Sequence, residues 1–183
     1  MGPPVLRATT SGPHAAAASS SDLVGKKLPV TRFRTADGGA IDLDAFAGKQ
    51  NVLVTILRGF GGQVCVYCTA QTKALADFVD RFAALDTKVV AVFPGPASGM
   101  EAFREAYRRT YGRGEKPPFE LLYDADLALT RALHIEDNIA VPTSLLLDRQ
   151  GIVRWSHVAK DHADRPSAKQ ILGRIREMEK QAR

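Results

Sequence analysis

NVLVTILRGFGGQVCVYCTAQ, residues 51–71, carries the strongest signals for the fold. It opens with a near-continuous apolar run at 51–57, which is typical of a strand covered on both faces. After a glycine-containing loop come Cys65 and Cys68, the two cysteines of the chain. Apolar residues then recur at helical spacing: Leu75, Phe78, Val79, Phe82 and Leu85. We therefore expect a buried strand, a loop and one long amphipathic helix with the cysteines at its start.

A Cys-x-x-Cys pair at the start of a helix indicates thiol redox chemistry. The first turn of a helix offers unpaired backbone N–H groups and a partial positive charge, and both favour a thiolate. Cys65 lies at the exposed end, so we expect its pKa to fall below the usual value of about 8.5. Cys68 precedes Leu75 by seven residues and so shares its buried face. The sequence thus predicts Cys65 as the nucleophile and Cys68 as the resolving thiol.

A cysteine pair can also bind a metal or fill part of a core. A structural zinc needs four ligands, and the four histidines (His14, His134, His157 and His162) show no paired ligand spacing. We therefore expect no metal and no other cofactor. Free cysteines can also be small buried hydrophobes. A non-catalytic binding module with inert cysteines stays open as an alternative.

Length and charge limit the functional classes. A chain of 183 residues fits one domain that needs no disulfide staples, which makes redox chemistry the better use of a lone cysteine pair. The net charge of +5 arises from basic residues spread among acids, so we expect no nucleic-acid partner. No run of about 18 apolar residues is present, so we expect no membrane span.

Residues 1–21 differ in composition from the rest of the chain. They contain no acid before Asp22 and consist largely of small residues and proline, which predicts a disordered low-complexity tail ahead of a domain at 22–183. The tail lacks the apolar run of a signal peptide, and its single Arg7 disfavours an organellar transit peptide. We expect a cytoplasmic protein; an extracytoplasmic or organellar location stays open.

Downstream of residue 22, strands and helices alternate, which predicts a mainly parallel sheet. The expected elements are an N-terminal β-hairpin around 28–43, a strand at 88–93, a helix opened by Ser98 with Glu101 in capping-box register, a polar loop at 112–118, a short strand at 119–123, a helix starting near 124 or 126 and running to about 133, an antiparallel hairpin at 143–155 and a final helix at 167–181.

Residues 22–183 resemble the thioredoxin-like superfamily, and more closely its peroxiredoxin-related branch, the alkyl hydroperoxide reductase/thiol-specific antioxidant group. The matching elements are Arg58-Gly59-Phe60 after the core strand, the cysteine motif continuing to Gln71, and Val141-Pro142-Thr143 before a strand that ends in Asp148. The resemblance implies an α/β thioredoxin-like fold, with a central mixed sheet flanked by helices and an N-terminal β-hairpin extension.

The resemblance also implies an activity: reduction of hydroperoxides through a Cys65/Cys68 dithiol-disulfide cycle. Arg58 would supply positive charge, and Tyr67 is a candidate wall of a substrate groove. Val141 would precede a cis-Pro142 that faces the cysteine pair, leaving the Val141 backbone free to hold an extended substrate.

The chain departs from the family pattern in the loop that orients the peroxide. Relatives carry Pro-x-x-x-Thr-x-x-Cys, whereas Gly62 stands at the threonine position counted from Cys65, and Ser144 stands where many relatives have an arginine. Aligning that loop on Cys68 instead would make Cys68 the peroxidatic residue. Protein disulfide exchange by a thioredoxin-like oxidoreductase is the second activity that stays open.

The partners follow from these activities. The oxidant would be a hydroperoxide or a protein disulfide, and the reductant a thioredoxin-type protein or a low-molecular-weight thiol; a homodimer stays open. His157 and His162 follow the last predicted strand, so we expect them far from the cysteines and without a catalytic role.

Overall fold

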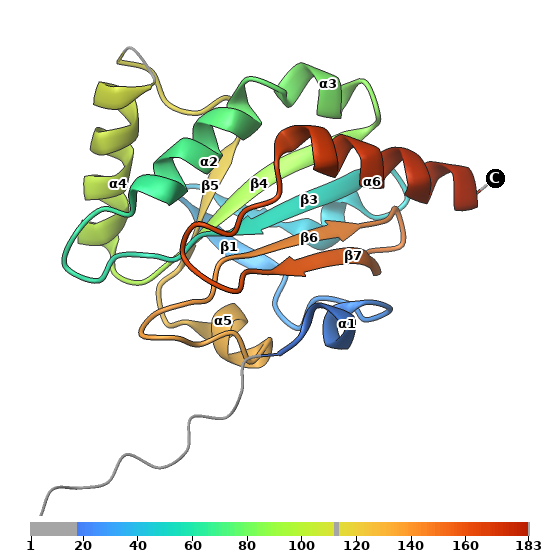
Figure 1. Cartoon of the computed structure of the whole chain (residues 1–183), viewed down its shortest axis with the longest axis horizontal. Coiled ribbons are helices and arrows are strands. Elements are labelled where there is room, and N and C mark those ends of the chain that lie inside the picture. The colour runs from blue at the N-terminus through green and yellow to red at the C-terminus, as the bar shows by residue number, and fades with distance from the viewer. Residues whose placement is uncertain (1–17, 112–113, 183) are drawn as a thin grey trace, which may run out of the picture.

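A seven-stranded mixed sheet forms the centre of the protein. The structure is a computed structural model that describes residues 18–111 and 114–182. The strand order is β2-β1-β5-β4-β3-β6-β7, with β3, β4 and β5 parallel to one another and the other pairs antiparallel (Figure 1). The strands are β1 Arg32–Thr35, β2 Ala40–Asp42, β3 Asn51–Ile56, β4 Thr87–Pro94, β5 Glu120–Asp124, β6 Thr143–Leu147 and β7 Val153–Val158. This arrangement confirms the predicted α/β thioredoxin-like fold with a mixed sheet. The prediction of a mainly parallel sheet is wrong, because two of the six strand pairs among the described residues are parallel and four are antiparallel: the N-terminal hairpin and the β6–β7 hairpin flank the parallel centre.

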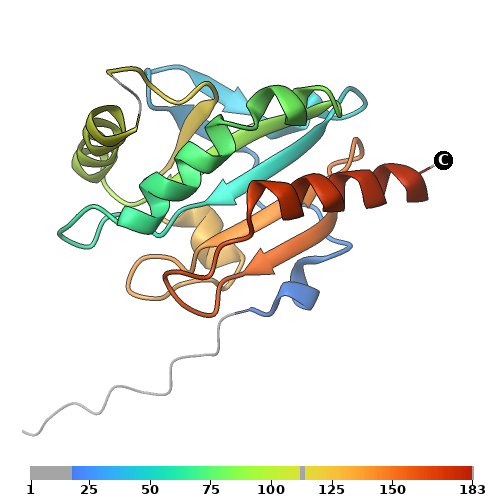
Figure 2. The ribbon, with the colours of Figure 1, turned by 45° about the horizontal axis from the view of Figure 1, so that its top comes forward.

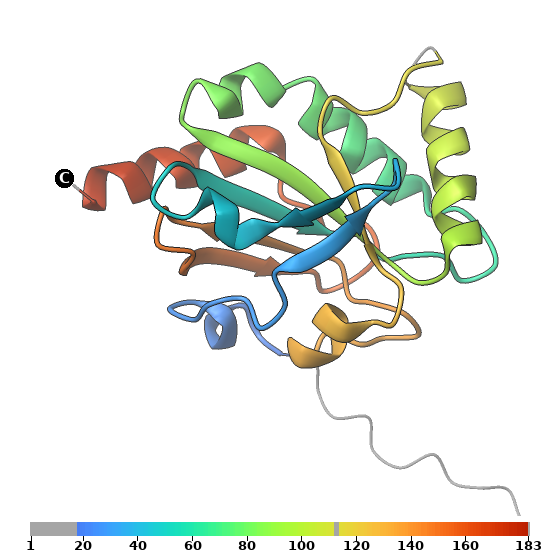
Figure 3. The ribbon, with the colours of Figure 1, turned by 180° about the vertical axis from the view of Figure 1, so that it is seen from behind.

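Helices cover both faces of the sheet. The helices are α1 Ser20–Leu23, the 3-10 helix η1 Leu43–Phe46, α2 Val66–Ala76, α3 Val79–Ala83, α4 Ala97–Thr110, α5 Ala128–Ala132 and α6 Ala168–Gln181. In Figure 2, α2 and α6 lie on the same face of the sheet, and α3 continues from α2. Figure 3 shows α1 and α5 on the opposite face. None of the helices in the described part of the chain is long and apolar enough to cross a membrane.

The two faces of β3 explain its apolar sequence. All six residues of the strand are buried. Leu53 belongs to the core under α2, α3 and α6, whereas Val54 and Ile56 belong to the core on the side of α1 and α5. Successive side chains of a strand point to opposite faces, so a strand between two cores must be apolar throughout.

The predicted long helix after the cysteines is wrong in one respect, because two helices form. Phe78 leaves the helical path with φ −115° and ψ 4°, which ends α2 and starts α3. Leu75 and Phe82 nevertheless lie in the same core. The apolar spacing therefore predicted the buried face correctly and did not reveal the break.

The predicted start of α4 is also wrong. The helix begins at Ala97 with Pro96 as its N-cap, so Ser98 lies inside it and does not form a capping box with Glu101. Pro96 holds φ at −71° and has no N–H to satisfy, which suits a residue at a helix start.

The predicted boundary between tail and domain falls inside an ordered element. Helix α1 begins at Ser20, whose hydroxyl accepts a hydrogen bond from the Val158 backbone at 2.9 Å. Residues 18–21 thus belong with the sheet edge, and the rest of the predicted tail, 1–17, lies outside the described residues. Of the predicted loop at 112–118, residues 112 and 113 also lie outside them.

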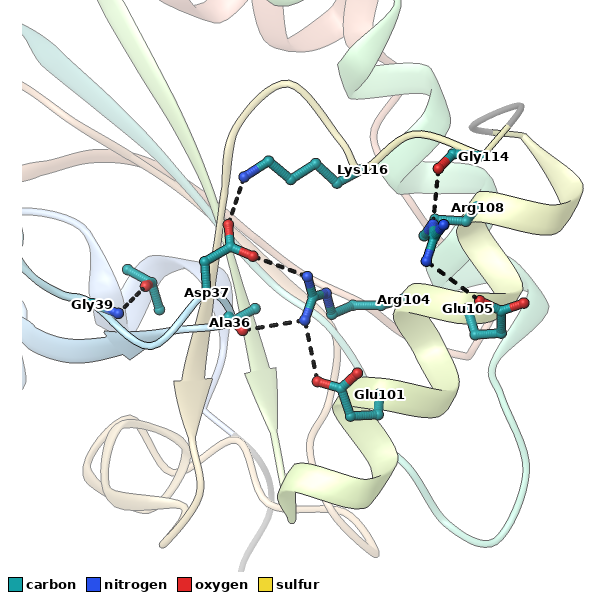
Figure 4. A network of polar contacts seen from close by, with 10 residues as sticks. Ala36, Asp37, Gly39, Glu101, Arg104, Glu105, Arg108, Gly114 and Lys116 are labelled. Atoms are coloured by element: carbon teal, nitrogen blue, oxygen red, sulfur yellow. Dashed lines mark hydrogen bonds and ion pairs between the residues drawn. The ribbon is translucent and has the colours of Figure 1, made fainter.

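Ion pairs attach the N-terminal hairpin to helix α4 (Figure 4). Arg104 donates to the Ala36 carbonyl at 3.2 Å and to Asp37 at 2.9 Å, and Lys116 donates to Asp37 at 2.6 Å. Hydrogen bonding from Lys116, with the charges of both cations, lowers the pKa of Asp37. Each exposed pair contributes little stability, but together they fix the turn of the hairpin beside α4.

Candidate active site

The chain leaves β3 through a turn that only glycine accommodates. Gly59 has φ +86°, and a Cβ at this position would lie 2.3 Å from the Pro94 carbonyl oxygen and 2.8 Å from a methyl group of Ile139. The backbone therefore passes close to the end of β4 before it turns toward the cysteines. Cys65 is the N-cap of α2, and its carbonyl accepts hydrogen bonds from the backbone N–H of Cys68 at 3.1 Å and of Thr69 at 3.2 Å.

The two cysteines are free thiols in different environments. Cys65 is partly buried at the helix end, whereas Cys68 is 1% exposed and packs in the core with Leu75. The backbone N–H of Arg58 donates to the Cys68 sulfur at 3.4 Å. This arrangement matches the predicted placement of a surface thiol and a core thiol one helical turn apart.

Hydrogen bonding between the cysteines separates their acidities. Hydrogen bonding from the Cys68 side chain is the largest cause that lowers the pKa of Cys65 to about 5; partial burial opposes the shift, while the Cys68 and Tyr67 backbone N–H groups and the Arg165 charge support it. The pKa of Cys68 is raised, first by this hydrogen bond and then by burial and by the charge of Cys65. At neutral pH, Cys65 is therefore the thiolate and Cys68 holds the proton.

Arg165 is a site residue that the sequence patterns did not indicate. It lies in the loop between β7 and α6, and its charge lowers the pKa of Cys65. Sheet register explains this position, because Val158 pairs with Thr143 and Thr143 pairs with Ile56. The loop after β7 therefore begins at the same end of the sheet as the loop after β3.

The same register corrects the expectation for the two histidines. The segment that contains them does not lie at the far end from the cysteines. His157 is within β7 and contacts Asp164 at 3.0 Å, next to Arg165 in the chain. No described contact joins His157 to either cysteine, so the histidine is near the site without being part of the thiol pair.

The prediction of a cis peptide bond before Pro142 is wrong. The Val141–Pro142 bond is trans, the form that is favoured for most prolines. The Val141 N–H donates to the Ile135 carbonyl at 2.7 Å, and the Val141 carbonyl accepts from the Thr143 hydroxyl at 3.0 Å. Both backbone groups of Val141 are thus occupied within the chain and do not face outward to hold an extended substrate.

A cavity of about 240 Å³ lies between α2 and the start of α6. Its lining includes Tyr67, Gln71 and Arg165, together with small apolar residues of both elements. A larger cavity of about 500 Å³ lies among Asn51, Arg149 and Glu179, at the opposite end of β3 from the cysteines. The smaller cavity is the one that matters for thiol chemistry, because it adjoins the cysteine motif.

Neither of the two positions that depart from the family pattern carries a cation. Gly62 is exposed and has φ +91°. Ser144 is 1% exposed inside β6 and offers no cation. Within residues 18–111 and 114–182, no three histidine, cysteine or acidic side chains gather as metal ligands.

A mixed sheet with a Cys-x-x-Cys pair in the first turn of the helix after its central strand defines a thioredoxin-like dithiol protein. The Redoxin family model matches residues 23–172, and the chain belongs to the Redoxin family. This membership confirms the predicted resemblance to the peroxiredoxin branch and the assignment as an oxidoreductase. No curated protein matches the chain.

Several solved structures share the fold. The reduced 2-Cys peroxiredoxin of Plasmodium vivax is 20% identical with a TM-score of 0.75, covering 87% of this chain and 83% of that one. The mitochondrial 2-Cys peroxiredoxin of Plasmodium falciparum is 16% identical with a TM-score of 0.71, covering 85% and 94%. AhpC of Mycobacterium bovis is 14% identical with a TM-score of 0.70, covering 86% and 93%.

Proposed function

We propose that the protein reduces hydroperoxides through a Cys65/Cys68 dithiol-disulfide cycle. The observation that carries the proposal is the asymmetry of the pair: an accessible thiolate at Cys65 and a buried, protonated thiol at Cys68. A dithiol cycle uses both, a thiolate for the attack on the peroxide and a second thiol in the same chain to trap the oxidised sulfur. The peroxiredoxin names of two structural relatives agree with this choice of oxidant.

The first step oxidises Cys65. Its thiolate attacks the terminal oxygen of the hydroperoxide, the O–O bond breaks, and the leaving alkoxide takes a proton to become an alcohol or water. Cys65 becomes a sulfenic acid. Arg165 and the N–H groups at the start of α2 stabilise the Cys65 thiolate, and the same positive charges would stabilise the negative charge that moves onto the peroxide oxygens.

The second step forms the disulfide. The Cys68 sulfur attacks the Cys65 sulfenic sulfur, the S–S bond forms, and hydroxide leaves with the Cys68 proton as water. Two equivalents of an external thiol, or one thioredoxin-type dithiol, then return the pair to the reduced state. A cytoplasmic setting, where thiol pools are kept reduced, suits this cycle.

Exchange with protein disulfides is a second candidate function. Val66 and Tyr67 beside Cys65 are 68% and 47% exposed, which is unusual for apolar side chains of this size and suits contact with a protein partner. In that reaction the Cys65 thiolate attacks a disulfide, and Cys68 resolves the mixed disulfide.

Stopped-flow kinetics separate these functions. The reduced protein is mixed with hydrogen peroxide, cumene hydroperoxide or a model disulfide at pH 7, with Cys65→Ser and Cys68→Ser as controls. Ionisation alone gives Cys65 about 30-fold more thiolate at pH 7 than a free cysteine, as follows from its pKa of about 5 against about 8.5.

We therefore expect hydroperoxide rates more than 30-fold above those of free cysteine, lost in Cys65→Ser. Rates at or below this level, with rapid reaction of the model disulfide, would assign the protein to disulfide exchange. Slow reaction with all three oxidants would leave the non-catalytic module.

A further inference from the structure

Only one nitrogen of the Arg165 guanidinium donates hydrogen bonds to the described residues. Its Nη1 donates to the backbone carbonyl of Asp164 at 3.0 Å and to that of Asp161 at 3.4 Å. Its Nε and Nη2 are buried and have no hydrogen-bond partner among the residues that the structure describes. Buried donors without partners cost free energy, so a pair of them beside an active site points to a ligand that would satisfy them.

Gln71 presents a complementary group in the same cavity. Its side chain is 6% exposed, and its Oε1 has no hydrogen-bond partner within the described chain. Gln71 comes from α2 and Arg165 from the loop before α6, and both line the cavity of about 240 Å³. The cavity is therefore lined by two side chains that carry, just beneath the accessible surface, two unpaired donors and one unpaired acceptor.

These donors select a carboxylate. Nε–H and Nη2–H lie on one edge of the planar guanidinium and point the same way, which matches the two oxygens of a carboxylate. The Gln71 oxygen can accept an N–H or O–H of the same ligand. The cavity is smaller than the roughly 300–1,000 Å³ of drug-sized pockets, so its occupant is a small molecule.

We propose that the cavity of about 240 Å³ lined by Gln71 and Arg165 binds the carboxylate of a small thiol that reduces the Cys65–Cys68 disulfide. The inference rests on the proposed dithiol cycle and names the class of its reductant. Cys68 is 1% exposed, so an external thiol can reach the disulfide only at Cys65. Tyr67, two residues after Cys65, forms part of the cavity wall, so the cavity adjoins the route by which a thiol reaches Cys65.

The chemistry balances with the thiol as the only reductant. A thiolate attacks the Cys65 sulfur, the Cys65–Cys68 bond breaks, and Cys68 leaves and takes up a proton. A second thiolate attacks the sulfur of the bound thiol in the mixed disulfide, and Cys65 leaves as a thiolate. Two small thiols are oxidised to their disulfide, and the protein is reduced by two electrons.

A matched pair of reductants tests the proposal. The protein is oxidised with diamide, which makes the measurement independent of peroxide, and is then reduced with N-acetylcysteine or with its amide. These thiols differ only in the carboxylate. The ratio of their rates is compared between wild type and Arg165→Gln, because a change in the intrinsic reactivity of the protein disulfide cancels in that comparison.

We expect Arg165→Gln to lower the carboxylate-to-amide ratio by about tenfold or more, the effect of losing a charge-assisted bidentate pair. The matched control is Arg174→Gln, an exposed arginine of α6 paired with Glu177, which should leave the ratio unchanged. Arg165→Lys keeps the charge and loses the fork, so it should lose most of the preference. Full preference in Arg165→Lys, or an unchanged ratio in Arg165→Gln, overturns the site.

A measurement on the wild type keeps the test independent of variant folding. Iodoacetate and iodoacetamide alkylate Cys65 and also differ by a carboxylate against an amide. The ratio of the iodoacetate rate to the iodoacetamide rate should be at least about fivefold higher for Cys65 than for free N-acetylcysteine, the effect of one charge-assisted contact. The same ratio for both thiols contradicts the site. Arg165→Gln can lower the carboxylate-to-amide ratio while the hydroperoxide rates stay no more than about 30-fold above those of free cysteine, the increase expected from ionisation alone. In that case the carboxylate site is supported and the peroxidase proposal fails.

Discussion

Cys65 and Cys68 lie one helical turn apart at the start of α2, and Cys65 is partly buried whereas Cys68 lies in the protein core. Hydrogen bonding from the Cys68 side chain, together with this difference in burial, gives the two cysteines different roles. It stabilises the thiolate at the accessible position and keeps the proton on the buried one. The resolving thiol is thus also the group that activates the nucleophile.

Removing the Cys68 donor should raise the pKa of Cys65. In the wild type, the rate of alkylation by iodoacetamide should reach half its maximum near pH 5 and be constant by pH 7, because a lowered thiol pKa makes the thiolate present above about 5. In Cys68→Ala the midpoint should move upward by at least about one pH unit, since the largest cause of the shift is lost.

Cys68→Ser is the control for this profile, because its hydroxyl can still donate a hydrogen bond. Its midpoint should lie below that of Cys68→Ala. A wild-type midpoint near the ordinary value of about 8.5, or the same midpoint in all three proteins, would show that Cys68 does not activate Cys65.

The turn at Gly59 should tolerate no side chain. In Gly59→Ala the new Cβ would meet the Pro94 carbonyl oxygen at 2.3 Å, so the loop carrying Arg58 must move and its N–H must leave the Cys68 sulfur. We expect a loss of several kcal/mol in urea unfolding, together with slower alkylation of Cys65 at pH 6.

Gly62→Ala is the matched variant, since Gly62 has a similar φ of +91° but nothing within 4 Å of its Cβ position. It should lose only about 1–2 kcal/mol, the cost of a left-handed residue with a side chain. Equal losses in the two variants would refute the close approach to Pro94.

Helix glycines should differ in the same way. In Gly99→Ala a Cβ would lie 2.4 Å from the Phe60 Cβ, so α4 and the loop before the cysteines would be forced apart at a cost of about 1–3 kcal/mol. Gly173→Ala in α6 has free space and should stabilise the protein by about 0.5–1 kcal/mol. Thermal unfolding of both variants measures this, and a stabilised Gly99→Ala would show that Phe60 does not pack there.

The apolar pattern of the chain predicted most of the fold and the thiol pair. The run at 51–57 became β3 because both of its faces are covered, and the seven-residue spacing of Cys68 and Leu75 placed both in the core. These patterns are visible in the sequence because the buried positions of a helix or strand recur at a fixed spacing. The break at Phe78 depends on backbone angles that apolar spacing does not encode.

Arg165 could not be found in this way. It lies in a loop without periodicity, one hundred residues after Cys65, and reaches the cysteines only through the register of β3, β6 and β7. The predicted hairpin at 143–155 was the one clue in the sequence, because such a hairpin returns the chain to the end of the sheet where β3 ends. The failed prediction for Pro142 came from the family resemblance, whereas the hydrogen bonds of Val141 and Pro142 are satisfied with a trans bond.

Trapping of the sulfenic acid identifies the cysteine that the peroxide oxidises. Reduced wild type, Cys65→Ser and Cys68→Ser each receive one equivalent of hydrogen peroxide with dimedone present, and the products are mapped by mass spectrometry. We predict a dimedone adduct on Cys65 in Cys68→Ser, no adduct in Cys65→Ser, and an intramolecular Cys65–Cys68 disulfide without adduct in the wild type. An adduct on Cys68 that forms in Cys65→Ser as fast as the wild type forms its disulfide would contradict the proposed cycle, because the buried thiol would then be the peroxidatic one.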